Sequence, residues 1–259
     1  MLRSLKDLER YTVSATDGEL GTVENFLLDD ERWVVRYLVV AAGGLLDGRR
    51  VLISPISFRN ADWSSRRFHL ALTVAKIESS PGVDVDKPVS RQHEAKYYRH
   101  YDYPSYWGGS GVWGMGTYPG TLLSSDPSGR IEARFQADAV KGETNPSGDV
   151  HLRSAREVCG YQVLGSDEAV GRVADFIIDD ETWEVRYLVV KTGHWWSGKE
   201  VLVAPHWARR VSWEDRTVHV DLTRHAIKGS PAWDASEAVN RQYESHLYDY
   251  YGRPVYWAA

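Results

Sequence analysis

Alternation of apolar and polar positions predicts β-strands along most of the chain. Residues Trp33–Val40 are rich in β-branched and aromatic side chains, which favours a strand with Val35, Tyr37 and Val39 facing the core. Further strands are predicted at intervals of about 8–12 residues, separated by glycine, proline and acidic turns. This spacing is typical of a small antiparallel β-barrel or β-sandwich.

The whole pattern occurs twice. Residues 2–107 align with residues 152–257 without a gap, at a constant offset of 150 positions. The segment FLLDDERWVVRYLVV at Phe26–Val40 matches FIIDDETWEVRYLVV at Phe176–Val190. Because every loop keeps its length, we expect both repeats to share one backbone. A residue present in both repeats is a candidate for a role in the fold, and a residue that differs can be specific to one repeat.

Each repeat ends in a predicted helix followed by an aromatic tail. Ser90 and Asn240 are good N-caps for helices over about 91–100 and 241–250. A glutamate follows in each first turn, where the helix dipole favours a negative charge. Because a group of this many aromatic rings rarely remains exposed to water, each tail is predicted to cross its barrel as an aromatic strap. The strap residues are Tyr106, Trp107, Tyr256 and Trp257.

These features divide the chain into three predicted parts. Residues 1–107 form the first barrel with its helix and tail, and residues 151–259 form the second. Residues 108–150 are predicted to be a linker, because they begin with a glycine-rich stretch and then hold no apolar periodicity. Trp113 and Tyr118 are candidates for local anchors within it.

Composition excludes several classes of function. A chain of 259 residues suits two domains of ordinary size. A net charge of −5 gives no electrostatic support to nucleic-acid binding. No apolar run approaches the roughly 20 residues of a membrane-spanning helix. Cys159 is the only cysteine, so no internal disulfide can form, which fits a cytoplasmic location.

The residues do not predict an enzyme, a metal site or a cofactor. Asp29-Asp30-Glu31 lacks the spacing of a calcium loop and is interpreted as a turn in which an aspartate accepts backbone hydrogen bonds. His69 and His219 are interpreted as surface residues, because a metal needs several converging ligands. Cys159 has no marked base beside it, and no G-x-S-x-G motif is present. His151 has no counterpart in the repeat and is assigned to no site.

Arg36 and Arg186 stand in the middle of a predicted strand in both repeats. Contact with an anion is one interpretation. The favoured one is a structural ion pair, formed by Arg36 with Glu94 or with the acidic turn. Val34 is predicted to face water, because its counterpart is Glu184.

The combination of motifs resembles a PRC-barrel domain. The pattern G-x-V-x-[DN]-F-[LI]-[LI]-D-D-E-x-W-x-[VI]-R-Y-L-V-V with G-[RK]-x-V-L-[IV]-x-P is similar to sequences of this family. It lies at Gly21–Val40 with Gly48–Pro55, and again at Gly171–Val190 with Gly198–Pro205. The trailing R-Q-x-E…Y-W segment and the two-copy layout resemble bacterial tandem PRC-barrel proteins.

The resemblance implies a mainly β fold of two small, strongly bent antiparallel β-barrels, each followed by a short helix and an aromatic tail. Members of this family include the cytoplasmic domain of the photosynthetic reaction centre H subunit and the C-terminal domain of a ribosome maturation factor. In both, the module contacts other proteins and performs no chemistry. The membrane-spanning helix of the former and the RNA-linked domain of the latter have no equivalent here, so neither specific role is carried over.

The largest difference between the repeats lies at a hairpin tip. The first repeat has Leu45 and Leu46 where the second has Trp195 and Trp196. Adjacent side chains in extended backbone diverge, so both tryptophans cannot point into one core. Aromatic residues of this kind anchor interfaces. These four residues are predicted to form an inter-domain or partner interface, with packing on the chain's own tail as the alternative.

The favoured hypothesis is a non-enzymatic adaptor or structural module of two barrels in a pseudo-twofold arrangement, similar to a fused homodimer. Its partner would be an unidentified protein or a second copy of the chain. One alternative is a small aromatic or quinone-like ligand held between barrel and tail. Another is peripheral association with a membrane or a photosynthetic complex, which the absence of a basic amphipathic helix disfavours.

Overall fold

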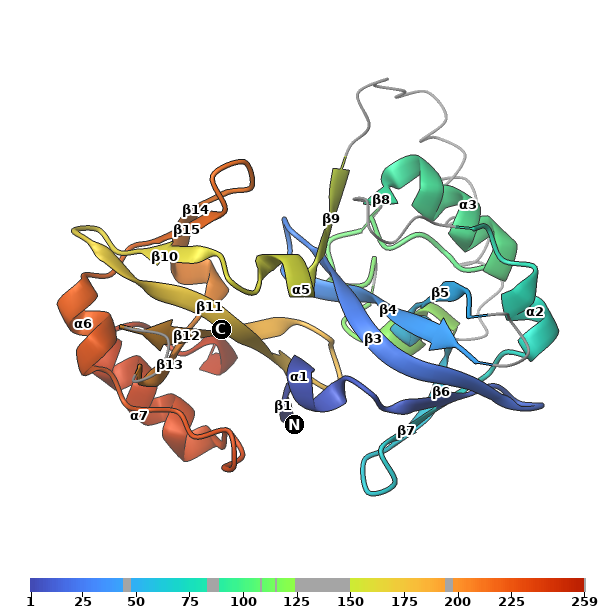
Figure 1. Ribbon diagram of the computed structural model, residues 1–259, viewed down its shortest axis with the longest axis horizontal. Helices are drawn as coiled ribbons and strands as arrows, with labels where there is room; N and C mark the ends of the chain where they lie inside the picture. The colour runs from blue at the N-terminus through green and yellow to red at the C-terminus, as the bar shows by residue number, and fades with distance from the viewer. Residues whose placement is uncertain are drawn as a thin grey trace. The chain divides into compact units, whose positions relative to one another are not determined.

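The computed structural model describes residues 1–43, 48–82, 89–107, 109–114, 116–123, 150–193 and 198–258. Most of its elements are strands (Figure 1): β1 (Leu2–Ser4), β2 (Thr12–Ser14), β3 (Glu19–Asp29), β4 (Val34–Ala42), β5 (Arg50–Ile53), β6 (Phe58–Asp62), β7 (Arg67–Leu70), β8 (Val89–Ser90), β9 (Val150–Ser154), β10 (Gln162–Leu164), β11 (Ala169–Asp179), β12 (Val185–Thr192), β13 (Glu200–Val203), β14 (Ala208–Ser212) and β15 (Thr217–Val220). The fold is mainly β, as the sequence predicts.

The helices are short. The α-helices are α1 (Leu5–Leu8), α2 (Val74–Glu78), α3 (Arg91–Tyr101), α5 (Ala155–Val158), α6 (Arg224–Gly229) and α7 (Arg241–Tyr251). Single 3₁₀ turns occur at η2 (Pro55–Ser57), η3 (Pro119–Leu123), η5 (Pro205–Trp207) and η6 (Tyr256–Ala258). In the described part of the chain, no helix is long and apolar enough to cross a membrane.

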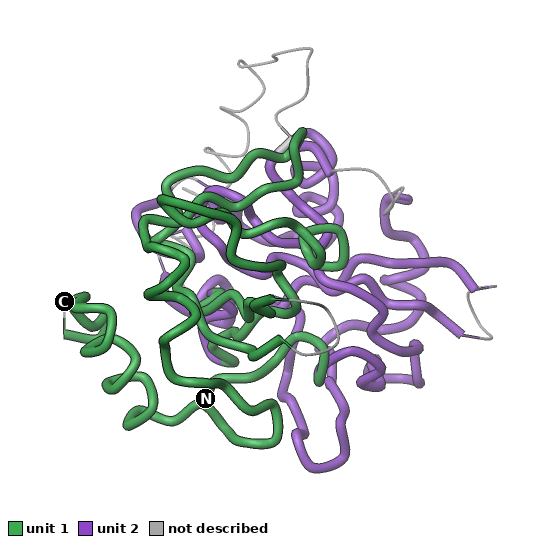
Figure 2. Tube along the Cα trace, turned by 60° about the vertical axis from the view of Figure 1, so that its left-hand side comes forward, with its two compact units in different colours: residues 1–7, 155–180, 185–259 green, residues 8–154, 181–184 purple. Residues whose placement is uncertain are grey.

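The chain forms two compact units, coloured separately in Figure 2. Unit 1 contains residues 1–7, 155–180 and 185–259, and unit 2 contains residues 8–154 and 181–184. The units therefore interleave along the sequence. The sequence-based division at residues 107 and 151 stays a prediction about domains.

Each unit contains one bent sheet with the same topology. In unit 2 the strand order is β5-β4-β3-β2-β7-β6, and in unit 1 it is β13-β12-β11-β10-β15-β14. One described pair in each sheet is parallel, β2 with β7 and β10 with β15, and the neighbouring pairs on these paths are antiparallel. The outermost strands do not pair with each other among the described residues, so each bent sheet remains open.

The bends arise at equivalent positions in the two sheets. Register shifts interrupt β3 at Val23/Asn25 and Leu27/Leu28, and they interrupt β11 at Val173/Asp175 and Ile177/Ile178. A bulge of this kind bends a strand and increases its twist. These irregularities let an 11-residue strand curve around the core of its unit.

Glycine at positions 21 and 171 is required by a close approach of two strands. A Cβ on Gly21 would lie 1.9 Å from the carbonyl oxygen of Ala41, and one on Gly171 would lie 2.0 Å from that of Lys191. The neighbouring backbone cannot move far enough to make room for a side chain at either position. The glycine thus serves the sheet itself, which explains its presence in both repeats.

The two sheets also receive strands from opposite repeats. Strand β1 lies at the start of the first repeat but pairs with β11 in unit 1, where Leu2, Arg3 and Ser4 face Asp179, Ile178 and Ile177. Strand β9 lies at the start of the second repeat but pairs with β3 in unit 2, in the same register at the offset of 150. Each sheet is thus completed by a strand from the start of the other repeat.

We expect deletion of residues 1–4 to destabilise unit 1. The deletion removes β1 from β11 and takes away Ser4, whose hydroxyl donates to the buried carboxylate of Asp175 at 2.5 Å. Losing a few net hydrogen bonds and one partner of a buried acid corresponds to about 1–3 kcal/mol. Amide hydrogen exchange, followed by mass spectrometry, should show lost protection in β11. Protection lost only in unit 2 would contradict the exchanged-strand arrangement.

The helix predictions are confirmed. Ser90 and Asn240 cap α3 and α7 by accepting from the backbone amides of His93 and Tyr243. Thr73 and Thr223 cap α2 and α6 in the same way. Figure 1 shows α6 and α7 on the side of β12 and β13.

The expected orientation of Val34 is wrong. Val35, Tyr37 and Val39 are buried as predicted, but Val34 has no exposed surface either. Within unit 2, it forms a β-bridge with Glu184, its own counterpart in the repeat. The backbone of residues 183–184 pairs with this end of β4, and the amide of Val35 donates to the carbonyl of Trp183 at 2.8 Å. A polar residue at the equivalent position of the other repeat therefore does not indicate exposure here.

Candidate functional site

A buried carboxylate is the centre of the most connected polar cluster in unit 2. Glu94 has no exposed surface, although it lies in the first turn of α3. The hydroxyls of Tyr37 and Tyr106 donate to its Oε1 at 3.0 and 2.9 Å. His151 Nε2 lies 2.6 Å from Oε2, and Arg91 Nη1 donates to Oε2 at 3.2 Å. We refer to these five residues as the Glu94 cluster.

Four separate elements build this cluster. The N-cap at Ser90 starts α3 so that Glu94 points towards the sheet, while Tyr37 comes from the middle of β4. Tyr106 lies in the aromatic tail and His151 lies in β9, the strand at the start of the second repeat. The cluster therefore links the sheet, the helix, the tail and the added strand of unit 2.

The hydroxyls of Tyr37 and Tyr106 keep their protons, and so remain hydrogen-bond donors, throughout the physiological pH range. Burial, and then the charge of Glu94, raises the pKa of Tyr37 and of Tyr106 well above the usual value of 10.0. A phenol that keeps its proton can donate to a carboxylate but cannot act as a base. Stable donors of this kind suit a structural role for Glu94.

Arg36 connects this cluster to the acidic turn. Its Nε and Nη2 donate to Asp29 Oδ2 at 3.1 and 2.8 Å, and its guanidinium lies 3.8 Å from the centre of the Tyr106 ring. Burial alone would raise the pKa of Asp29, but the charge and hydrogen bonds of Arg36 outweigh it and lower the pKa. The ion pair with the acidic turn is the one that forms, not a pair with Glu94.

The predicted turn is confirmed in detail. Asp29 Oδ1 accepts from the backbone amides of Glu31 and Arg32, both at 3.1 Å. This leaves Oδ2 for Arg36. Asp29 thus satisfies the turn and the arginine together, which accounts for both residues in the first repeat.

Trp113 covers this arrangement from the predicted linker. It has no exposed surface, its Nε1 donates to the carbonyl of Thr182 at 2.7 Å, and its ring lies 4.7 Å from the Arg36 guanidinium. Arg36 Nη1 also donates to the carbonyl of Val112 at 2.7 Å. The expectation that Trp113 anchors the linker is confirmed, whereas Tyr118 is exposed.

Unit 1 contains the equivalent cluster at the offset of 150. The hydroxyls of Tyr187 and Tyr256 donate to Glu244 Oε1 at 2.8 and 2.9 Å, and Arg241 lies 3.1 Å from Oε2. This copy is more open, because Tyr256 is half-buried and the Arg241 side chain is 58% exposed. The position equivalent to His151 is Met1.

The second arginine pair is correspondingly weaker. Arg186 Nη2 lies 3.8 Å from Asp179 Oδ2, and about a fifth of each side chain is exposed, at 19% and 23%. The first pair is 0% and 3% exposed. The two repeats therefore provide a buried and a partly exposed version of the same contacts.

The strap residues pack on the helix of their own unit. Trp107 lies 5.3 Å from the Tyr98 ring of α3, and Trp257 lies 5.6 Å from the Tyr248 ring of α7. Tyr106 is fully buried, while Trp107, Tyr256 and Trp257 are half-buried. Tyr98, Arg36 and Trp113 occupy the space around the Tyr106 ring, which disfavours the hypothesis of a quinone-like ligand there.

Some candidate residues lie outside the described structure. Leu45, Leu46, Trp195 and Trp196 belong to residues 44–47 and 194–197, so their proposed interface stays a prediction. His69 and His219 are half-buried. Within the described ranges, no group of three or more His, Cys, Asp and Glu side chains could hold a metal ion.

Sequence reasoning missed the central role of Glu94. The helix dipole accounts for a glutamate in the first turn without any partner, and His151 has no histidine at the equivalent position of the first repeat. The R-Q-x-E…Y-W segment was the available signal, since its Arg, Glu and Tyr are Arg91, Glu94 and Tyr106. Only the fold shows that these residues meet Tyr37.

A comparison with protein families identifies a known domain within the second repeat. The model of the PRC-barrel domain family matches residues 151–226. An uncharacterized protein from Deinococcus radiodurans is 34% identical over 95 residues, which cover 36% of this chain. The aligned region spans 33% of that protein, so this chain matches only about a third of its curated relative.

Proposed function

We propose that both repeats are PRC-type barrels and that the chain is a non-enzymatic protein-interaction or structural adaptor module. One observation carries the proposal: Tyr37 and Tyr106 both donate to Glu94 in unit 2, as Tyr187 and Tyr256 both donate to Glu244 in unit 1. The family model matches residues 151–226 only. This common geometry and the gapless repeat support extending the family to residues 2–107.

The use of the shared polar residues supports a role without catalysis. A catalytic group must reach a substrate and often has a pKa poised for proton transfer. In the Glu94 cluster, the carboxylate oxygens are instead occupied by side chains of the same unit. The cluster holds the aromatic tail against α3 and the sheet. Binding would then fall to the outer surfaces and hairpin tips.

The hairpin tips supply the experiment. We expect Trp195→Ala with Trp196→Ala to reduce recovery of a partner protein from cell extract, or to reduce self-association measured by light scattering, because tryptophans are frequent interface anchors. The melting temperature should stay within a few degrees, since a hairpin tip contributes little to a core.

The repeat provides a matched control. Leu45→Ala with Leu46→Ala changes the equivalent positions of the first repeat and tests whether any apolar pair at this tip is sufficient. Loss of association in the tryptophan variant alone would assign the interface to the second repeat. Unchanged mass and unchanged partner recovery in both variants would refute an interface at the tips.

A further inference from the structure

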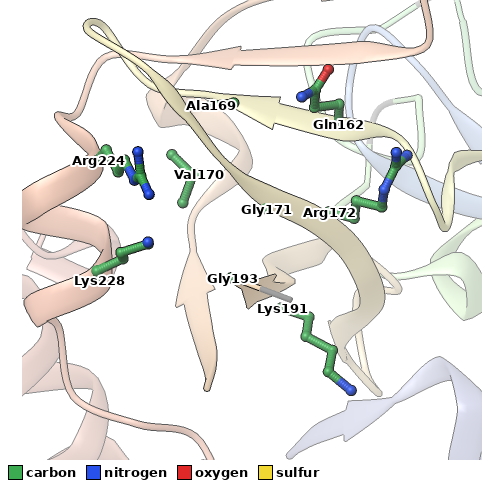
Figure 3. Close-up of a pocket in the computed structure, with 9 residues that line it drawn as sticks. All are labelled: Gln162, Ala169, Val170, Gly171, Arg172, Lys191, Gly193, Arg224 and Lys228. Carbon is green, nitrogen blue, oxygen red and sulfur yellow. The ribbon is translucent and has the colours of Figure 1, made fainter. Parts of the chain in front are cut away.

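Unit 1 contains a pocket lined by basic side chains. It has a volume of about 420 Å³ and lies among β10, β11, β12 and α6 (Figure 3). Arg172, Lys191, Arg224 and Lys228 line it, and none of the described lining residues is acidic. A pocket of this size can hold a small molecule. The charged side chains that line it are therefore all cationic, although Glu168 and Glu200 are close to the wall, paired with Arg224 and opposite Lys191.

Two of these cations have fixed partners and two do not. Arg172 donates to the carbonyl of Gly160 at 2.7 Å, and Arg224 forms an ion pair with Glu168 just outside the pocket. The Nζ atoms of Lys191 and Lys228 make no hydrogen bond or ion pair with another described residue. Both lysines are nevertheless half-buried. Their charge is available to a ligand.

The basic residues also stand in two like-charged pairs. Arg172 and Lys191 are directly opposite each other on the antiparallel strands β11 and β12. Like charges at such positions destabilise a sheet. Arg224 and Lys228 are four residues apart on α6, a spacing at which like charges destabilise a helix. Lys191 also faces Glu200 on β13, which offsets part of this repulsion in the sheet. A bound anion would relieve the repulsion that remains, chiefly between the two α6 residues.

The first repeat shows that the fold does not require these charges. The equivalents of Arg172, Lys191, Arg224 and Lys228 are Thr22, Ala41, Val74 and Glu78. All four basic residues are absent there, although Gly171 in the pocket wall has its counterpart in Gly21. The same backbone is thus built without the cations, which points to a function specific to the second repeat.

We propose that this pocket binds a small ligand carrying at least two anionic groups, either phosphates or carboxylates. Figure 3 shows Arg224 and Lys228 together beside Val170, while Arg172 lies with Gln162 farther along the sheet and Lys191 lies apart from both. Cations at separate places suit separate anionic groups better than one compact ion. Arginine guanidinium groups and lysine ammonium groups both form charge-assisted hydrogen bonds with phosphates and carboxylates.

The test uses the full chain with pyrophosphate, inorganic phosphate and citrate in isothermal titration calorimetry at low ionic strength. Pyrophosphate or citrate should bind more tightly than inorganic phosphate, and added salt should weaken the binding. Preference for pyrophosphate would indicate a phosphorylated ligand, and preference for citrate a polycarboxylate. Absence of measurable binding by either, or equal binding of inorganic phosphate, would overturn the proposal.

Lys191→Ala with Lys228→Ala should weaken the binding roughly tenfold, because each charged hydrogen bond contributes appreciably. Without ligand, this variant should melt at about the wild-type temperature, since lost repulsion with Arg172 and Arg224 is offset by the lost attraction between Lys191 and Glu200. The control Lys76→Ala with Lys96→Ala changes the net charge equally on unit 2. Equal affinity in the pocket variant and the wild type would refute the site. This test is independent of the proposed adaptor function.

Discussion

We expect Glu94→Ala to lower the free energy of unfolding by about 3–5 kcal/mol, because breaking a buried ionic cluster leaves its other members without their counter-charge. Arg91, Tyr37 and Tyr106 would each lose their acceptor at a site with no exposed carboxylate surface. Urea denaturation followed by tryptophan fluorescence measures this loss. The effect is predicted to be among the largest of any single substitution in unit 2.

Two variants separate the contribution of the Glu94 charge from that of its packing. Glu94→Gln preserves shape and one acceptor oxygen, so it should cost less than Glu94→Ala. Glu244→Ala makes the same change in unit 1, where the Arg241 side chain is 58% exposed and water can replace the lost carboxylate. A smaller loss is therefore expected there. If the alanine variants at 94 and 244 were equally destabilised, burial would not be the reason for the importance of Glu94.

The repeated local patterns explain why so much of the fold could be predicted. Strand alternation, the caps at Ser90 and Asn240, and the acidic turn each depend on residues close together in the sequence. Each of these patterns occurs in both repeats, so a pattern that arose by chance in one repeat could be recognised by its absence from the other. The same comparison fails where the two repeats have different surroundings, as with Val34 and Glu184.

The exchanged strands could not be predicted for a different physical reason. Leu2-Arg3-Ser4 and Leu152-Arg153-Ser154 are identical, and their partner strands β11 and β3 accept them in the same register. The sequence pattern therefore does not decide which segment pairs with which sheet. His151 is inseparable from this problem, because it reaches Glu94 only when β9 joins unit 2. Only the tertiary structure shows which sheet each segment joins and that His151 reaches Glu94.

Arg36→Met is predicted to destabilise the protein by about 3–5 kcal/mol at neutral pH, because it leaves the buried carboxylate of Asp29 unpaired. Methionine retains much of the length of the side chain, so the loss reports mainly on the charge and its hydrogen bonds. Arg186→Met is the matched control. Its ion pair with Asp179 is longer and partly exposed, so about 1 kcal/mol or less is expected. Denaturation of the two variants side by side gives the comparison.

The pH dependence of this difference tests its cause. In the wild type, the pKa of Asp29 lies below its ordinary value of 3.8, so the ion pair stabilises the fold above about pH 4 and this contribution is lost as pH falls through the folded-state pKa. In Arg36→Met, burial without the guanidinium should raise the pKa of Asp29, and protonation then relieves the unpaired charge. The stability gap between wild type and variant should therefore narrow on going from pH 7 to pH 4. A gap that stays constant or widens towards acid would show that lost packing on Tyr106 and Trp113, and not the charge of Asp29, accounts for the effect.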